Sequence, residues 1–144
     1  MSAEAPVTIR PYADPDAESV AALWDAVFGP ARDRNEPAAV IRAKVAQGDG
    51  LFFVAADSND RPAGTVMAGY DGHRGWIYTL AVREDMRRRG IASRLLRHAE
   101  AELTARGCLK INLQVRPAQA DAVAFYKTMG YLVEERVSLG KRPT

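Results

Sequence analysis

Residues 76–93, WIYTLAVREDMRRRGIAS, constrain the fold of this chain more than any other stretch. They read as a buried strand, a short basic turn with one glycine, and the beginning of a long helix. Gly90 and Ala92 carry almost no side chain, so the backbone amides of residues 88–92 can lie bare at the helix start. Bare amides at the positive end of a helix dipole bind anions, and phosphate is the usual biological one. The stretch therefore predicts a phosphorylated ligand beside the end of a strand.

The charge balance of the whole chain limits what this ligand can be. The 144 residues carry a net charge of only +2, and the basic excess is local to residues 83–97. A nucleic-acid-binding domain usually shows a stronger basic excess on one face. We therefore expect a small polyanion at the turn and no nucleic acid partner.

Length and cysteine content predict the domain organisation and the compartment. A chain of this size fits one compact domain, expected over residues 7–144, with residues 1–6 as a short N-terminal tail. The single cysteine, Cys108, excludes an intramolecular disulfide and favours a reducing compartment. The N-terminus lacks a signal-peptide pattern, and no apolar run approaches the ~20 residues that span a bilayer. We expect a cytoplasmic protein with no membrane partner.

Hydrophobic periodicity and turn residues predict a mixed order of strands and helices. The expected strands are residues 7–10, 51–57, 63–70, 76–82, 109–115 and one or two within 131–139. The expected helices are residues 15–28 with Asp14 as cap, 36–47 with Asn35 as cap, 90–106, and 119–129. The short turns after the second and third strands favour an antiparallel meander.

Two motifs stand at the expected places in this order. The run RRRGIA at residues 87–92 has the form Arg-x-x-Gly-x-Ala and follows a strand, and the run FYKTMGY at residues 125–131 ends a helix. Together they resemble the GNAT superfamily of acetyl-CoA-dependent N-acetyltransferases, and the resemblance covers residues 7–139. Residues 64–75 and 138–142 are similar to a small bacterial branch of it labelled YpeA.

The resemblance implies an α/β fold (α+β in some schemes) of the GNAT acyl-CoA N-acyltransferase type. In that fold a twisted, mixed and mostly antiparallel central sheet is flanked by about four helices. The YpeA label carries no substrate, so the branch adds nothing about the acceptor.

The cosubstrate that the resemblance implies is acetyl-CoA, and no metal is expected. Its pyrophosphate corresponds to the amides at the helix start and to the side chains around them. These residues are Arg87, Arg88, Arg89, Gly90, Ile91, Ala92 and Ser93. From the residues alone, a plain helix start with solvated arginines stays an alternative.

The resemblance also assigns the strand before the arginines to the pantetheine arm. The arm would pair like an added strand with backbone groups of Leu80, Ala81 and Val82. The Leu80 amide would then point at the thioester carbonyl and stabilise the charge that develops there. Asn112 and Gln119 are further cofactor-binding candidates, although the family often has Asn where this chain has Gln119.

Tyr126 matches the family's tyrosine that can give a proton to the departing thiolate, and it also counts among the cofactor-binding residues. A phenol with a pKa near 10 is a credible donor to an alkyl thiolate of similar basicity. The alternative is a core aromatic residue without a catalytic role.

The general base stays open. Many relatives use a glutamate on the strand before the arginines, and this strand contains none. Tyr78, expected on the same face as Leu80, could line the acceptor site or act as base. His73 titrates in the right range, and Asp71 could orient it. Glu84 and a chain of water molecules are the other candidates.

The implied function is acetyl transfer from acetyl-CoA to a primary amine by direct attack in a ternary complex. The acceptor is a small-molecule amine or a protein amine, chosen by the first helices and the loop at residues 30–35. A catalytically silent CoA-binding sensor or partner module is the alternative. The oligomeric state is left open between monomer and homodimer.

Overall fold

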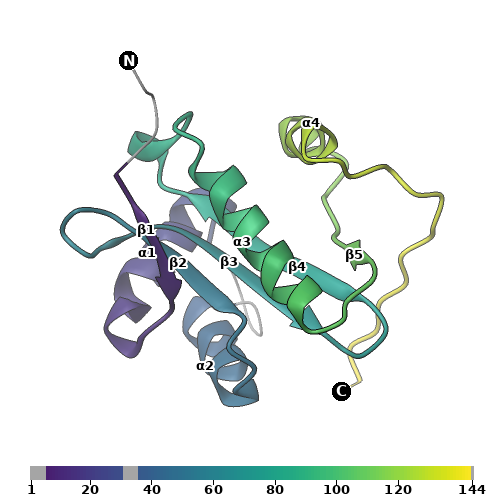
Figure 1. Ribbon diagram of the computed structural model, residues 1–144, viewed down its shortest axis with the longest axis horizontal. Coiled ribbons are helices and arrows are strands. Elements are labelled where there is room, and N and C mark those ends of the chain that lie inside the picture. The colour runs from purple at the N-terminus through teal and green to yellow at the C-terminus, as the bar shows by residue number, and fades with distance from the viewer. Residues whose placement is uncertain (1–5, 31–35, 144) are drawn as a thin grey trace. The chain divides into compact units, whose positions relative to one another are not determined.

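The computed structural model describes residues 6–30 and 36–143. The chain forms two compact units, Met1–Leu113 and Gln114–Thr144, each of which is described by itself (Figure 1). The first unit contains a five-stranded sheet and the second contains the helix α4 (Ala120–Thr128). The single domain expected over residues 7–144 stays a prediction.

The sheet of the first unit has the strand order β1-β2-β3-β4-β5. Its strands are β1 (Thr8–Pro11), β2 (Phe52–Ala56), β3 (Pro62–Tyr70), β4 (Gly75–Val82) and β5 (Ile111–Asn112). The first four strands pair antiparallel with their neighbours, whereas β5 pairs parallel with β4. The predicted α/β fold with a mixed, mostly antiparallel sheet is therefore confirmed.

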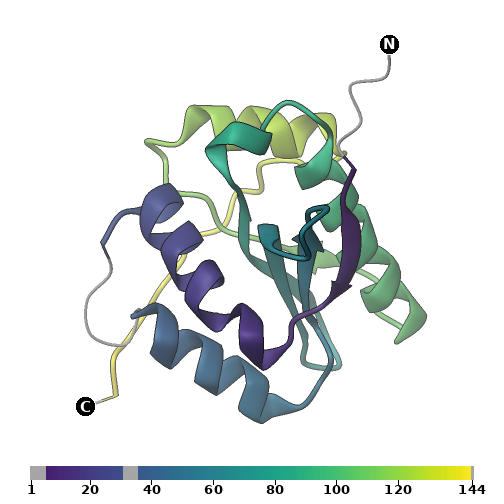
Figure 2. The same cartoon turned by 90° about the vertical axis from the view of Figure 1, so that its left-hand side faces the viewer.

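Helices cover both faces of this sheet (Figure 2). Two of them, α1 (Ala17–Phe28) and α2 (Pro37–Gln47), lie on one face, and α3 (Ile91–Ala105) lies on the other. The first pair shares an apolar cluster with the sheet, which consists of Val20, Leu23, Trp24, Ile41, Phe52, Val54, Met67 and Ala81. Burial of this cluster provides the main driving force that holds α1 across β3 and β4.

The beginning of α1 differs from the prediction. Asp14 does not cap this helix, because residues Asp14–Asp16 form a separate 3₁₀ turn and α1 begins at Ala17. The side chain with a local backbone partner is that of Asp16, which accepts the Ala13 amide at 2.9 Å. α1 and α2 end as predicted, at Gly29 with φ 82° and at Gly48 with φ 62°. The predicted cap Asn35 lies outside the described residues.

Two predicted strands are shorter than expected or absent from the described residues. β5 covers two residues of the predicted 109–115, and Leu109 is 95% exposed. No strand forms among described residues 131–143. Alternating or β-branched sequence favours a strand only where a neighbouring strand supplies hydrogen bonds and packing, and β4 pairs with β5 only through Gly75 and Trp76.

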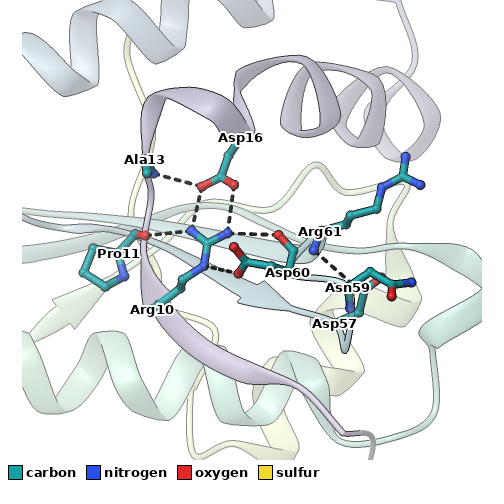
Figure 3. Close-up of polar contacts among 8 residues, drawn as sticks. All are labelled: Arg10, Pro11, Ala13, Asp16, Asp57, Asn59, Asp60 and Arg61. Atoms are coloured by element: carbon teal, nitrogen blue, oxygen red, sulfur yellow. Dashed lines mark hydrogen bonds and ion pairs between the residues drawn. The ribbon is translucent and has the colours of Figure 1, made fainter.

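The guanidinium of Arg10 ties the β1–α1 connection to the β2–β3 turn (Figure 3). It binds both carboxylate oxygens of Asp16 at 2.8 and 2.9 Å, and its Nε donates to Asp60 Oδ1 at 3.0 Å. Its Nη atoms also donate to the carbonyls of Pro11 and Asp60. Burial alone would raise the pKa of Asp16, but the hydrogen bonds from Arg10 and Ala13 outweigh it and hold that pKa below its usual range.

We predict that Asp16→Asn lowers the free energy of unfolding at pH 7 by about 2 kcal/mol, because it leaves the partly buried Arg10 charge without its anion. The folded-state pKa of Asp16 is lowered, so its stabilising contribution is complete above the unfolded pKa near 4 and is lost as pH falls through the folded pKa. Urea denaturation from pH 7 downward should therefore show the two proteins converging below about pH 4.

The matched control is Asp14→Asn, which removes the same charge from an exposed position of the same 3₁₀ turn. It should cost less than about 0.5 kcal/mol. Equal losses in the two variants would show that net charge, and not the Arg10 contact, sets the stability.

Candidate active site

The central irregularity of the sheet is a bulge in β4. Thr65 lies opposite Ala81, and Met67 lies opposite Tyr78. Between these two pairs β3 advances by two residues and β4 by three, so β4 contains one extra residue. The extra residue falls at Thr79 and Leu80, and Thr79 has a φ of 47°. A β-branched residue in this left-handed region is strained, at a cost of order 1–3 kcal/mol.

The bulge corrects the expected orientation of Tyr78. Residues directly opposite in antiparallel strands share a face, so Tyr78 lies on the face of Met67 and Ala81. Leu80, the neighbour of Ala81, points to the other face, because the bulge breaks the alternation that the sequence implied. Tyr78 is 48% exposed, and burial together with the charge of Asp71 raises its pKa.

Beyond Trp76 the outer edge of β4 has no strand partner within the first unit, because β5 pairs only with Gly75 and Trp76. The Arg83 amide donates to Ala63 of the β3 side at 2.7 Å. Successive residues direct their backbone groups to opposite edges, so those of Val82 face the open edge. Arg87 Nε donates to the Val82 carbonyl at 3.2 Å. This edge offers backbone hydrogen bonds to an extended ligand.

The predicted anion loop follows β4 directly. After the 3₁₀ turn η3 (Glu84–Met86), Arg88 has a φ of 62° and Gly90 a φ of 77° at the cap of α3. The Arg94 amide donates to the Gly90 carbonyl at 3.1 Å. The N–H groups of residues 90–93 therefore precede the regular helical bonds. A Cβ added to Gly90 would meet no atom within 4 Å, so the space before these amides is open.

The arginines of this loop have exposed side chains. Arg87 is held by its bond to Val82, and Arg89 Nη1 lies 3.9 Å from Met86 Sδ. The loop is therefore a concave set of amides surrounded by positive charge, which is the chemistry of a phosphate site.

His73 lies far from this loop. Its turn is held by Asp71 Oδ1, which accepts the His73 and Arg74 amides at 2.7 Å each. Asp71 thus binds backbone amides, whereas the expectation was that it orients the imidazole ring. The His73 turn precedes β4 and Leu80 is near the far end of that strand, about 20 Å away at the usual rise per residue.

A groove of about 750 Å³ lies on the α1 face beside the end of β4. One wall is α1, with Leu23 and Val27, and the other is formed by Arg61, Arg83 and Glu84. The groove reaches Arg87 and so adjoins the anion loop. Glu84, one of the candidate bases, belongs to its lining.

Two buried residues, Trp24 of α1 and Thr65 of β3, support the bulge through hydrogen bonds. Trp24 Nε1 donates to Thr65 Oγ1 at 2.9 Å, and Thr65 Oγ1 donates to the Thr79 carbonyl at 2.8 Å. Trp24 has the helical spacing of a core residue, so nothing in the sequence distinguishes it. The hydroxyl of Thr79 is buried without a hydrogen-bond partner among the described residues.

The second unit contains two of the remaining predicted residues of the cofactor site, Gln119 and Tyr126. Gln119 is the N-cap residue of α4, without a side-chain capping bond. The ring of Tyr126 makes edge contacts with Phe125 and Tyr131, at centroid distances of 5.2 and 5.7 Å. Burial raises the pKa of Tyr126 to about 12. Asn112 lies in the first unit, where it pairs with Trp76.

No group of three or more His, Cys, Asp or Glu side chains is placed among the described residues to hold a metal ion. No helix in this part of the chain is long and apolar enough to cross a membrane.

Solved structures with the same fold include two CoA complexes. A chain of the NatC complex bound to Gag peptide and CoA matches with a TM-score of 0.79 and 24% identity, over 94% of this chain and 88% of that chain. The aminoglycoside N-acetyltransferase AAC(6′)-Iy in complex with CoA matches with a TM-score of 0.77 and 19% identity, over 96% and 95%. At these identities the likeness shows the fold alone.

The family assignment rests on similarity of sequence. The acetyltransferase (GNAT) family matches residues 16–131. A curated acetyltransferase of Pectobacterium atrosepticum is 40% identical over 134 residues, which cover 93% of this chain and 94% of the relative. Because both matches span most of the chain, it belongs to the GNAT family and is an acetyltransferase.

Proposed function

We propose that this enzyme transfers the acetyl group of acetyl-CoA to a primary amine by direct attack in a ternary complex. One observation supports the proposal most strongly: the open, bulged edge of β4 is followed, after the 3₁₀ turn Glu84–Met86, by backbone amides at the start of α3 that precede the regular helical bonds. In CoA an extended amide-containing arm is followed by a pyrophosphate, so these two parts would need an open strand edge and an anion site in this order.

The residues present fit acetyl-CoA. No atom lies within 4 Å of the place that a Cβ of Gly90 would take, so the protein itself leaves room for a phosphate there. The pyrophosphate would lie on the amides of residues 88–92, with Ser93 and Arg87–Arg89 as further donors. Leu80 and Val82 would hold the pantetheine arm through backbone groups at the open edge. The backbone groups of Ala81, the third residue expected here, are directed to Thr65 of β3.

Bound acetyl-CoA supplies an activated thioester. The Leu80 N–H would donate to the thioester carbonyl oxygen and stabilise the negative charge that develops on it. Tyr126 would protonate the departing sulfur. The pKa of about 12 keeps its phenol protonated at neutral pH and also makes it a weaker acid than free tyrosine.

The acceptor would approach on the α1 face, through the groove beside Glu84. We assign no single base: a water chain or Glu84 fits this location, and His73 lies at the opposite end of β4. The relatives with this fold include one bound to a peptide and one named for aminoglycosides, so the fold alone does not choose between protein and small-molecule amines. A cytoplasmic location and the choice between monomer and homodimer stay predictions.

We predict that Gly90→Glu weakens acetyl-CoA binding at least about 100-fold, because a side chain would fill the phosphate space and its charge would repel the ligand. Isothermal titration calorimetry with CoA measures the effect. Gly72→Glu is the matched control, since Gly72 has a φ of 88° and open space around it but lies in the turn before β4. The phosphate site is contradicted if Gly90→Glu binds CoA with normal affinity.

We predict that Tyr126→Phe lowers kcat about 10–100-fold and changes the affinity for acetyl-CoA little, because it removes a proton donor and keeps the aromatic ring. CoA release against a panel of primary amines and peptides measures kcat. Tyr131→Phe, from the same aromatic cluster, is the control. Unchanged turnover in Tyr126→Phe would remove the acid role. CoA binding without CoA release by the unmutated protein would instead favour the silent binding module.

A further inference from the structure

Two buried hydrogen bonds, from Trp24 to Thr65 and from Thr65 to the Thr79 carbonyl, form a relay. The relay ends on the Thr79–Leu80 peptide, whose N–H has the oxyanion role in the function proposed above. Thr65 is fully buried and Trp24 is 4% exposed. The indole nitrogen can only donate, so Thr65 Oγ1 accepts from Trp24 and must donate its own proton to the Thr79 carbonyl. The chemistry of the two partners therefore fixes the direction of the relay.

The Thr79 carbonyl and the Leu80 N–H belong to the same planar trans peptide, and they point in opposite directions. A hydrogen bond that holds the carbonyl toward Thr65 therefore also aims the Leu80 N–H away from it. A carbonyl that accepts a hydrogen bond polarises its peptide, which makes the N–H a stronger donor.

The bulge needs such support. Thr79 is held at a φ of 47°, a conformation that persists only where the surrounding structure imposes it. On both sides of the bulge the residues of β4 pair regularly with β3. The orientation of the peptide between Thr79 and Leu80 is therefore the one in β4 that the hydrogen bonds between the strands constrain least. The Thr65 hydroxyl contacts this peptide from the core.

We propose that Thr65 and Trp24 are positioning residues of the acetyltransferase, whose relay orients and polarises the Thr79–Leu80 peptide toward the thioester carbonyl. The inference rests on the role proposed above for the Leu80 amide. It adds two residues, buried under α1, that touch neither cosubstrate nor acceptor and act through one backbone group.

The test compares Thr65→Val, which is nearly isosteric and lacks the hydroxyl, with Thr65→Ser, which keeps it. Val54→Ala is the matched control, because Val54 lies opposite Thr65 on β2 in the same apolar cluster and outside the relay. Each variant is measured in two ways: by the Leu80 amide and Trp24 indole proton resonances of the free protein, and by kcat and KM for acetyl-CoA.

We expect Thr65→Val to move both resonances upfield and to lower kcat about tenfold, with KM for acetyl-CoA within about twofold. Full loss of an oxyanion donor costs more, and here the donor stays in place but is less well aimed. Thr65→Ser should keep the two resonances and kcat near those of the unmutated protein. Val54→Ala should lower the free energy of unfolding without moving the Leu80 resonance. If Thr65→Val fails to fold, Trp24→Phe breaks the first link, and it should move the Leu80 resonance in the same direction.

The inference is overturned if the Leu80 resonance stays in place in Thr65→Val, or if kcat falls no further than in Val54→Ala. Absence of CoA release by the unmutated protein with every amine tested would overturn the proposed function instead. In that case the two resonances still decide whether the relay orients the Leu80 peptide.

Discussion

The site depends on the register shift between β3 and β4. In a regular ladder, β4 would continue past Met67 with its alternation intact, and Tyr78 and Leu80 would share a face. The extra residue at Thr79 turns the strand so that Tyr78 shares the face of Met67 and Ala81 while Leu80 lies on the other face. Bulges are common beside active sites, where they redirect a side chain or end strand pairing. In the mechanism proposed above, this bulge aims the Leu80 amide.

The rest of the first unit holds β4 by pairing at one edge and leaves most of its other edge without a strand partner in that unit. On the inner edge, β4 pairs with β3 along most of its length. On the outer edge, β5 pairs only with Gly75 and Trp76, so within the first unit no strand covers the rest of that edge. The exit from β4 is anchored by the Arg83 side chain, which contacts Asp85 at 2.6 Å and Asp57 at 3.4 Å. The strand end, its open edge and the start of α3 therefore form one continuous surface.

The sequence predicted what depends on local chemistry and missed what depends on partners. Glycine spacing places the start of α3 at Gly90, and turn residues place the meander, because both are decided within a few residues. Phosphate binding at that helix start stays a prediction. The length of β5 depends on how far β4 offers hydrogen bonds, so the alternation at residues 109–115 overstated it. Tyr78 was assigned to the wrong face because a bulge has no sequence signature here. Trp24 and Thr65 carry only core-residue patterns, and their contact joins α1 to β3 across 41 positions.

The most direct test of this account is a titration of ¹⁵N-labelled protein with CoA, followed by amide resonances. The account predicts that the shifts concentrate at Leu80, Val82 and residues 88–93, and that the turn with Asp71 and His73 is unaffected. Saturable binding that leaves the Leu80 and Gly90 amides unchanged would contradict it.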